Sequence, residues 1–260
     1  ARNLRQRLDE GPRRDEIDQL AIHFNAMLNR LEAAFERQRS FVSHASHELR
    51  TPLAALKSEI QLGRSLPRSA EADQVMLINL ETDTDRLIAL INSLLFLART
   101  MEQASQTDFG PVRLDEVVFA AQEELIRQHP AYRIDVRYDQ LPSVGSHTLV
   151  EGNEGLLQRV ILNLVDNACK YSPDHRADVC ISAESRGCRL TVSDQGIGIP
   201  ANEQVSIFEP FYRSNEAMKY EGFGIGLAIC WQIIALHQGK ISLNSQVGHG
   251  SQFEVWLPNR

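Results

Sequence analysis

Apolar residues recur in alternating steps of three and four near the start of the chain, and this periodicity fixes its first structural element. The series is Ile17, Leu20, Phe24, Met27, Leu31 and Ala34. A mean spacing of 3.5 residues is the repeat of a coiled coil, so we expect a long helix that continues through Phe41 to Ala45. Gly11 and Pro12 break the chain before it, and no apolar element upstream covers the stripe. A partner chain is therefore favoured over packing within one domain.

A second helix is expected from about Ala70 to Met101, with a broad apolar stripe that is interrupted at Asp85. The segment 63–69 between the two helices contains glycine and proline, which favour a turn. Two long helices joined in this way form a hairpin. Because the stripe is too wide for one partner, two hairpins that form a four-helix bundle would bury it better.

Five consecutive residues in the first helix concentrate reactive side chains. His47 and Thr51 stand at i and i+4 and share one helix face, while Glu48 lies beside the histidine. A neutral imidazole is a nucleophile near neutral pH, and a neighbouring carboxylate can take its ring proton. Pro52 cannot donate to the carbonyl of Glu48, so we expect a kink there. Taken alone, a solvated helix face with an incidental histidine is the more frequent explanation.

The pattern changes after the polar segment 102–111, where we place a domain boundary. Beyond it we expect helices from Leu114 and over 153–171 and 225–237. The expected strands are 132–138, 179–183, 188–194, 240–244 and 251–257. Strands and helices in this irregular order predict a two-layer α/β sandwich and not a doubly wound parallel sheet.

The helix over 153–171 carries Asn163, Asn167 and Lys170 at i, i+4 and i+7, so they share a face. Amide oxygens suit magnesium, which binds through few protein ligands plus substrate phosphates. Lys170 is placed to meet a phosphate as a point charge. Polarity of an exposed helix face explains this trio equally well when it is considered alone.

Two glycine runs follow. Asp194 is an acceptor at a strand end, and Gly196 and Gly198 after it let a flat ligand approach the backbone. The second run, Gly222–Leu227, opens a helix whose free amides attract phosphates. This run does not follow a strand, which argues against a dinucleotide fingerprint, and it lacks the Gly-Lys-Ser/Thr of a phosphate-binding loop. Residues 209–221 between the runs, with Lys219, could close as a lid.

Together these motifs resemble those of bacterial sensor histidine kinases, and the resemblance covers nearly the whole chain. The matching stretches are the phosphoacceptor box at 41–53, the asparagine box at 163–172, glycine boxes at 194–198 and 222–227, a phenylalanine box at 208–213 and a weaker glycine element at 248–253. Residues 15–28 look like the second helix of a HAMP signal-relay module. Because several motifs occur in the order that the family has, the probability that they agree by chance is very small.

The resemblance implies three parts and an activity. Residues 1–38 would be a HAMP remnant and signalling helix, 39–103 a dimerising phosphotransfer hairpin, and 110–260 an ATP-binding domain of the Bergerat type. By the same resemblance His47 accepts the ATP γ-phosphoryl group with Glu48 as base. An aspartate in the receiver domain of a response regulator then takes the group, and Thr51 assists its removal from the regulator. His44 lies on the same helix face but lacks the motif context.

The resemblance also implies ATP and Mg²⁺ as ligands. Asn167 would hold the metal with Asn163 nearby, Lys170 and Tyr171 would face the phosphates and sugar, and Asp194 would accept from the adenine amino group. The other implied nucleotide contacts are Gly196, Gly198, Ile199, Lys219, Gly222, Gly224, Gly226 and Leu227. The short lid lacks the basic, glycine- and serine-rich form common in the family, which leaves its phosphate contact open.

Three alternatives stay open. Related ATPases place a water-activating glutamate four residues before the second asparagine, where this chain has Asn163, so simple hydrolysis is disfavoured. A degenerate scaffold would bind a regulator without phosphorylating it, although every chemical position is filled. Phosphatase activity could dominate in the absence of a signal.

The composition of the chain argues against several other classes of protein. A net charge of −7 argues against a nucleic-acid surface. No apolar run approaches the roughly 20 residues needed to span a bilayer, and the charged start is unlike a signal peptide. Four cysteines without metal-like spacing suggest reduced thiols in a cytoplasmic compartment. With the family resemblance, we expect the cytoplasmic portion of an inner-membrane sensor whose membrane spans lie upstream.

Overall fold

The computed structural model describes residues 7–8, 16–65, 69–102, 108–139, 148–220 and 222–259. The chain divides into two compact units, 1–87 and 88–260, and the boundary falls within helix α2 (Ala70–Glu102). Each unit is considered by itself. The Gly11-Pro12 break, residues 66–68 of the expected turn and residues 103–107 of the expected linker lie outside the described residues.

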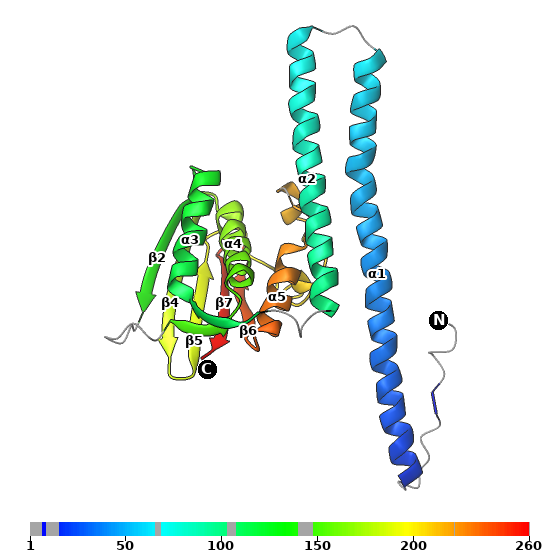
Figure 1. Cartoon of the computed structure of the whole chain (residues 1–260), viewed down its shortest axis with the longest axis vertical. Coiled ribbons are helices and arrows are strands. Elements are labelled where there is room, and N and C mark those ends of the chain that lie inside the picture. The colour runs from blue at the N-terminus through cyan, green and yellow to red at the C-terminus, as the bar shows by residue number, and fades with distance from the viewer. Residues whose placement is uncertain are drawn as a thin grey trace. The chain divides into compact units, whose positions relative to one another are not determined.

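The first unit contains helix α1 (Glu16–Ser65) and the first half of α2 (Figure 1). α1 runs unbroken into the His47 region, as the apolar periodicity predicts, and continues through Pro52, where the expected kink stays a prediction. The two helices come close near their connection, where the Asn79 side chain donates to Glu59 Oε1 at 3.3 Å. A Cβ on Gly63 would lie 2.6 Å from Met76 Sδ, so this position requires glycine or a shifted methionine.

The apolar stripe of the first unit faces outward. Among its described residues, Ala21 is the one apolar side chain that is buried. The large apolar side chains that are exposed in this unit include Leu20, Phe24, Met27, Leu31, Phe35, Val42, Leu53, Ile60, Val75 and Ile78. The stripe predicted from the sequence is therefore present but is not covered by the described part of this chain.

The second unit is built on a five-stranded mixed sheet in the order β2-β4-β5-β7-β6. These strands are β2 (Arg133–Asp139), β4 (Arg176–Glu184), β5 (Gly187–Ser193), β6 (Lys240–Gln246) and β7 (Gly250–Pro258). β2 runs parallel to β4, and the other neighbours are antiparallel. The prediction of an α/β sandwich without a doubly wound parallel sheet is confirmed.

Helices α3 (Leu114–Gln128), α4 (Glu154–Tyr171) and α5 (Gly226–Leu236) form the second layer against this sheet (Figure 1). A separate antiparallel pair, β1 (Gly110–Arg113) with β3 (Leu149–Gly152), was not predicted. The largest fully buried side chains of the core include Leu157, Ile161, Leu164, Ile181, Leu190, Ile229, Ile233 and Leu257. The core thus joins α4 and α5 to the central strands.

Helix α4 owes its position to a cap and a divided surface. The Asn153 side chain accepts a hydrogen bond from the backbone N–H of Leu156 at 3.0 Å and satisfies one donor of the first turn. The buried side consists of Leu157, Val160, Ile161, Leu164, Val165, Ala168 and Cys169. Because that side is held against the sheet and its neighbouring helices, the polar residues of the other side point away from the core.

Candidate functional site

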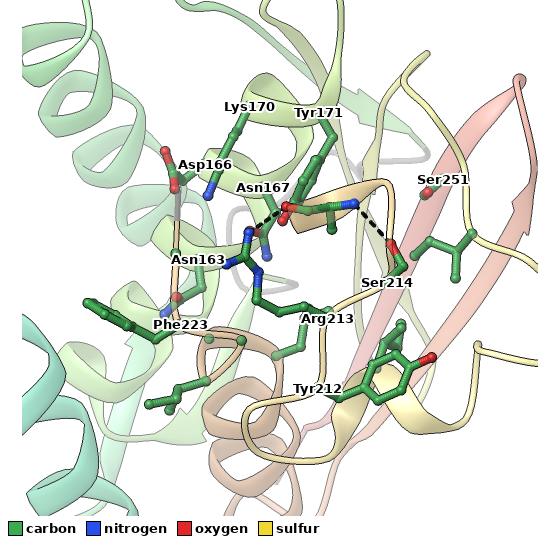
Figure 2. A pocket seen from close by; sticks show the side chains of 18 of the residues that line it. Asn163, Asp166, Asn167, Lys170, Tyr171, Tyr212, Arg213, Ser214, Phe223 and Ser251 are labelled. Atoms are coloured by element: carbon green, nitrogen blue, oxygen red, sulfur yellow. Dashed lines mark hydrogen bonds between the residues drawn. The ribbon is translucent and has the colours of Figure 1, made fainter. Parts of the chain in front are cut away.

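The polar side of α4 lines a cavity of about 420 Å³, a size typical of small-molecule sites. Asn163, Asp166, Asn167 and Lys170 all contribute to its wall. Figure 2 shows these four residues along one helix at the wall of the cavity. Two amides, a carboxylate and an ammonium therefore share one concave surface.

The two amides of this face differ in their engagement. Asn163 Nδ2 donates to the backbone carbonyl of Arg159 at 2.8 Å, and a Cβ on Gly226 would lie 2.6 Å from Asn163 Oδ1. Asn163 therefore packs against the first residue of α5. Within the part of the chain that the structure describes, Asn167 makes no hydrogen bond through its side chain. Asn167 is thus the amide of this pair with both its oxygen and its nitrogen available to a ligand.

Asp194 lies at the end of β5 and forms another wall of the cavity. Its Oδ1 accepts from the backbone N–H groups of Gly196 at 2.7 Å and Ser251 at 3.3 Å. Burial raises the pKa of this carboxyl, and the two backbone donors oppose that rise. Both bonds go to Oδ1, which leaves Oδ2 for a ligand donor.

Gly198 holds the turn after Asp194 in place. Its φ is +69°, in the left-handed region, and a Cβ there would lie 2.0 Å from the carbonyl oxygen of Gln246. The sequence suggested that this glycine admits a ligand. The structure adds that the β6–β7 connection approaches the same backbone, so a side chain has no room.

The second glycine run forms the start of α5 at the cavity wall. Gly222, Gly224, Gly226 and Leu227 all line the cavity. The unsatisfied N–H groups and the helix dipole make such a terminus attractive to anions. A Cβ on Gly222 would lie 3.1 Å from Lys170 Nζ, so the ammonium lies beside the glycine run. Positive charge and free amides converge at this end of the cavity.

The expected lid, residues 209–221, is a compact turn in its described part. The Arg213 guanidinium donates to the backbone carbonyls of Ala217 and Tyr220, and the first of these bonds is drawn in Figure 2. The Tyr220 ring packs edge-on against Tyr171 at 5.0 Å. Lys219 is exposed and is not among the residues that line the cavity, whereas Arg213 is.

The expected phosphoacceptor lies in the first unit, on α1. His47 is exposed, Glu48 is half-buried, and the Thr51 hydroxyl donates to the backbone carbonyl of His47 at 3.4 Å. His44, one turn earlier, is also exposed, and its Nδ1 lies 3.4 Å from Ser40 Oγ. The imidazole of His47 is thus accessible on a regular helix.

Comparison with known proteins also separates the helical first part of the chain from the part that contains the cavity. Residues 1–33 match the HAMP domain, residues 37–103 the His Kinase A (phospho-acceptor) domain, and residues 152–260 the Histidine kinase-, DNA gyrase B-, and HSP90-like ATPase family. The solved structure titled "Mycobacterial sensor histidine kinase MprB" is 30% identical, with a TM-score of 0.50, over 59% of this chain and 99% of that one. The chain belongs to the bacterial sensor histidine kinases.

Other relatives of this histidine kinase support the same family assignment. Sensor protein CutS of Streptomyces coelicolor is 34% identical over 98% of this chain and 61% of its own length. Sensor histidine kinase RppB of Synechocystis sp. is 34% identical over 86% of this chain and 50% of its own length. The Acinetobacter baumannii histidine kinase AdeS shares the fold, with a TM-score of 0.65, 22% identity and coverage of 82% of this chain and 97% of that one. The chain spans about half the length of the curated relatives it matches.

The cavity of the histidine kinase also contains residues that were not selected from the sequence, among them Asp166, Arg213 and Ser251. Asp166 stands at i+3 from Asn163, so helical spacing alone could have identified it. Arg213 lies in the segment between the two glycine runs, and Ser251 belongs to β7, far along the chain. Only the fold brings the last two to the cavity.

The cysteines of this histidine kinase are free thiols, as expected. Burial raises the pKa of Cys169, Cys188 and Cys230 to about 12, so these thiols are inert packing residues at neutral pH. Among the described residues, no helix is long and apolar enough to cross a membrane.

Proposed function

We propose that this chain uses ATP to phosphorylate His47 and passes the phosphoryl group to an aspartate in the receiver domain of a response regulator. The observation that carries this proposal is one cavity that joins the asparagine and lysine face of α4, Asp194 and the amide-rich start of α5. The same chain presents an exposed histidine beside a glutamate. A donor site and an acceptor are thus encoded together.

The nucleotide roles follow from the geometry of the cavity. Asp194 Oδ2 would accept from the adenine amino group while the backbone donors hold Oδ1. Tyr171 would lie along the sugar, and Lys170 and the start of α5 would neutralise the phosphates. The further nucleotide contacts of this proposal are Gly196, Gly198, Ile199, Gly222, Gly224, Gly226 and Leu227. Gly196 serves through its N–H to Asp194, because it is buried and does not line the cavity.

The donor set near the phosphates fits magnesium. Among the described residues, no cluster of three or more histidine, cysteine or acidic side chains could hold a metal by itself. Magnesium commonly binds through one or two protein oxygens plus phosphates and water, and Asn167 offers such an oxygen. When bound, Mg²⁺ would neutralise charge that develops on the transferred phosphoryl group.

At the acceptor, one ring nitrogen of His47 would form a bond to the γ-phosphorus while the bond from phosphorus to the ADP oxygen breaks. Glu48 would take the proton from the other ring nitrogen, which keeps the phosphorylated ring neutral. Thr51 would position water when phosphate is removed from the regulator. A hydrolase that activates water with a glutamate is disfavoured, because Asn163 occupies that place.

The partners belong to the same proposal. The uncovered apolar stripe on α1 and α2 supports a homodimer in which two hairpins form a four-helix bundle. The match of residues 1–33 to the HAMP domain and the sensor relatives support a cytoplasmic portion of an inner-membrane sensor. A receiver domain and a second copy are the protein partners, and nucleic acid is not one.

The test is transfer of label from γ-labelled ATP in the presence of Mg²⁺. We expect the wild-type chain to become labelled and the His47→Gln variant to lose all label. The His44→Gln variant is the matched control, because it removes an exposed imidazole one turn away on the same face, and it should remain labelled. Label that persists in the His47→Gln variant would show that another residue is the acceptor.

A further inference from the structure

The cavity contains a carboxylate that the roles above do not explain. Asp166 lies one residue before Asn167 and one turn before Lys170, and it lines the same cavity. A carboxylate beside a polyphosphate repels its ligand unless a cation stands between them. Asp is also a poor helix former in a helix interior, so helix propensity does not favour it at this position.

Asp166 is held by a residue from a different part of the fold. The Tyr132 hydroxyl, just before β2, donates to Asp166 Oδ1 at 2.9 Å. The Tyr132 ring is stacked against the rings of His129 and His175, with 4.7 Å and 6.0 Å between the ring centroids. A hydrogen bond to an ionised acceptor is among the stronger ones, so it fixes the carboxylate direction.

The position of the second oxygen then matters. With Oδ1 engaged by Tyr132, Oδ2 remains for the cavity that Asn167 also lines. Figure 2 shows Asp166, Asn167 and Lys170 along the same stretch of α4. An amide oxygen and a carboxylate oxygen in one cavity suit a hydrated divalent cation, which keeps several waters and binds few protein groups.

We infer that Asp166 accepts hydrogen bonds from the hydration shell of the nucleotide's divalent cation and makes nucleotide binding depend on that cation. Tyr132 is the positioning residue that orients the carboxylate. Asp166 repels the metal-free polyphosphate and attracts the metal complex. It therefore lowers the affinity for the metal-free nucleotide and raises the affinity for the metal-bound nucleotide. This inference rests on the proposed nucleotide site and adds a selectivity to it.

The measurable quantity is the ratio of the nucleotide dissociation constant in EDTA to that in Mg²⁺, which expresses the coupling between metal and nucleotide. Asp166→Asn removes the charge at nearly constant shape. We expect the ratio to fall about tenfold or more, the range found when groups behind metal ligands are removed. In EDTA the variant should bind nucleotide more tightly than the wild type does. A purely structural role for Asp166 would not produce that gain.

Two variants refine the test. Tyr132→Phe deletes only the hydroxyl, so the ratio should fall less than in Asp166→Asn. Asp178→Asn is the matched control, because it removes a carboxylate of the same unit that pairs with Arg137 and Arg176 on the sheet, away from the cavity. That variant should keep the wild-type ratio.

The experiment is equilibrium binding of a fluorescent ATP analogue to the full chain, with circular dichroism to verify folding. A ratio that falls in Asp166→Asn and stays constant in Asp178→Asn supports the inference. An unchanged ratio in folded Asp166→Asn overturns it while the nucleotide site stands. If that variant does not fold, an unchanged ratio in Tyr132→Phe overturns it instead. A wild-type chain that binds no nucleotide overturns the proposed function as well.

Discussion

Asp194 shows how one half-buried carboxylate can set the pH range of ligand binding. Burial raises its pKa, so its charge is lost at a higher pH than that of an exposed aspartate. Only the ionised form leaves Oδ2 as a strong acceptor for an amino group. The cost of burying the charge is present above the folded-state pKa and is relieved as the pH falls through it.

We therefore predict opposite pH trends for affinity and stability. As the pH falls from about 8 toward the raised pKa of Asp194, nucleotide affinity should fall while the contribution of this group to the free energy of unfolding rises. Asp194→Asn should bind more weakly at neutral pH and lose much of the pH dependence of affinity. Fluorescent-nucleotide titrations and thermal unfolding across the pH range measure both trends. An unaltered affinity profile in the variant would contradict this role.

At the scale of elements, the lid is a turn that is held together by hydrogen bonds to its own backbone carbonyl groups. Arg213 bonds two of them, and Tyr220 packs on Tyr171 at the end of α4. The two hydrogen bonds from this guanidinium hold the turn closed. Because Arg213 also lines the cavity, this residue links the lid to the ligand site.

Arg213→Ala should lower nucleotide affinity roughly tenfold or more, because each lost hydrogen bond costs about 1 kcal/mol. Lys219→Ala should change the affinity by less than about twofold, since its side chain is exposed outside the cavity. Both dissociation constants come from one titration series. A larger loss in Lys219→Ala than in Arg213→Ala would assign the phosphate contact to the lysine.

The elements of the second unit were largely predictable from the sequence. Alternating apolar residues gave the strands of the main sheet, and Asn153 marked the start of α4. The pair β1–β3 was missed because each strand has four residues, too few for a period to emerge. The Tyr132–Asp166 bond spans 34 positions and depends on how β2 pairs with β4, which local patterns do not specify.

Residues of the candidate site could be grouped from the sequence where they belong to the same helix. Asn163, Asn167 and Lys170 share a helix face, so their spacing placed them together before the structure did. Arg213 and Ser251 reach the cavity only through tertiary packing. The turn at Gly198 also acquires its steric reason from a distant connection, because Gln246 approaches it.

At the scale of the whole molecule, the first unit exposes the apolar stripe that its sequence predicts. Exposed apolar area of this kind marks an interaction surface. We predict that the chain is a dimer at micromolar concentration. Val42→Glu, which places a charge on the exposed stripe of α1, should weaken the dimer at least tenfold. Sedimentation equilibrium measures this, and a monomeric wild-type chain would contradict the proposed bundle.

The second unit holds a nucleotide-sized cavity, and the first presents His47. In the proposed reaction, nucleotide bound in this cavity phosphorylates the imidazole of His47. The most direct measurement is the position and chemistry of the phosphate after incubation of the chain with ATP and Mg²⁺. We predict phosphate on the peptide that contains His47, stable in base and labile in acid. Phosphate on a serine, threonine or aspartate, or on a peptide without His47, would show that His47 is not the acceptor.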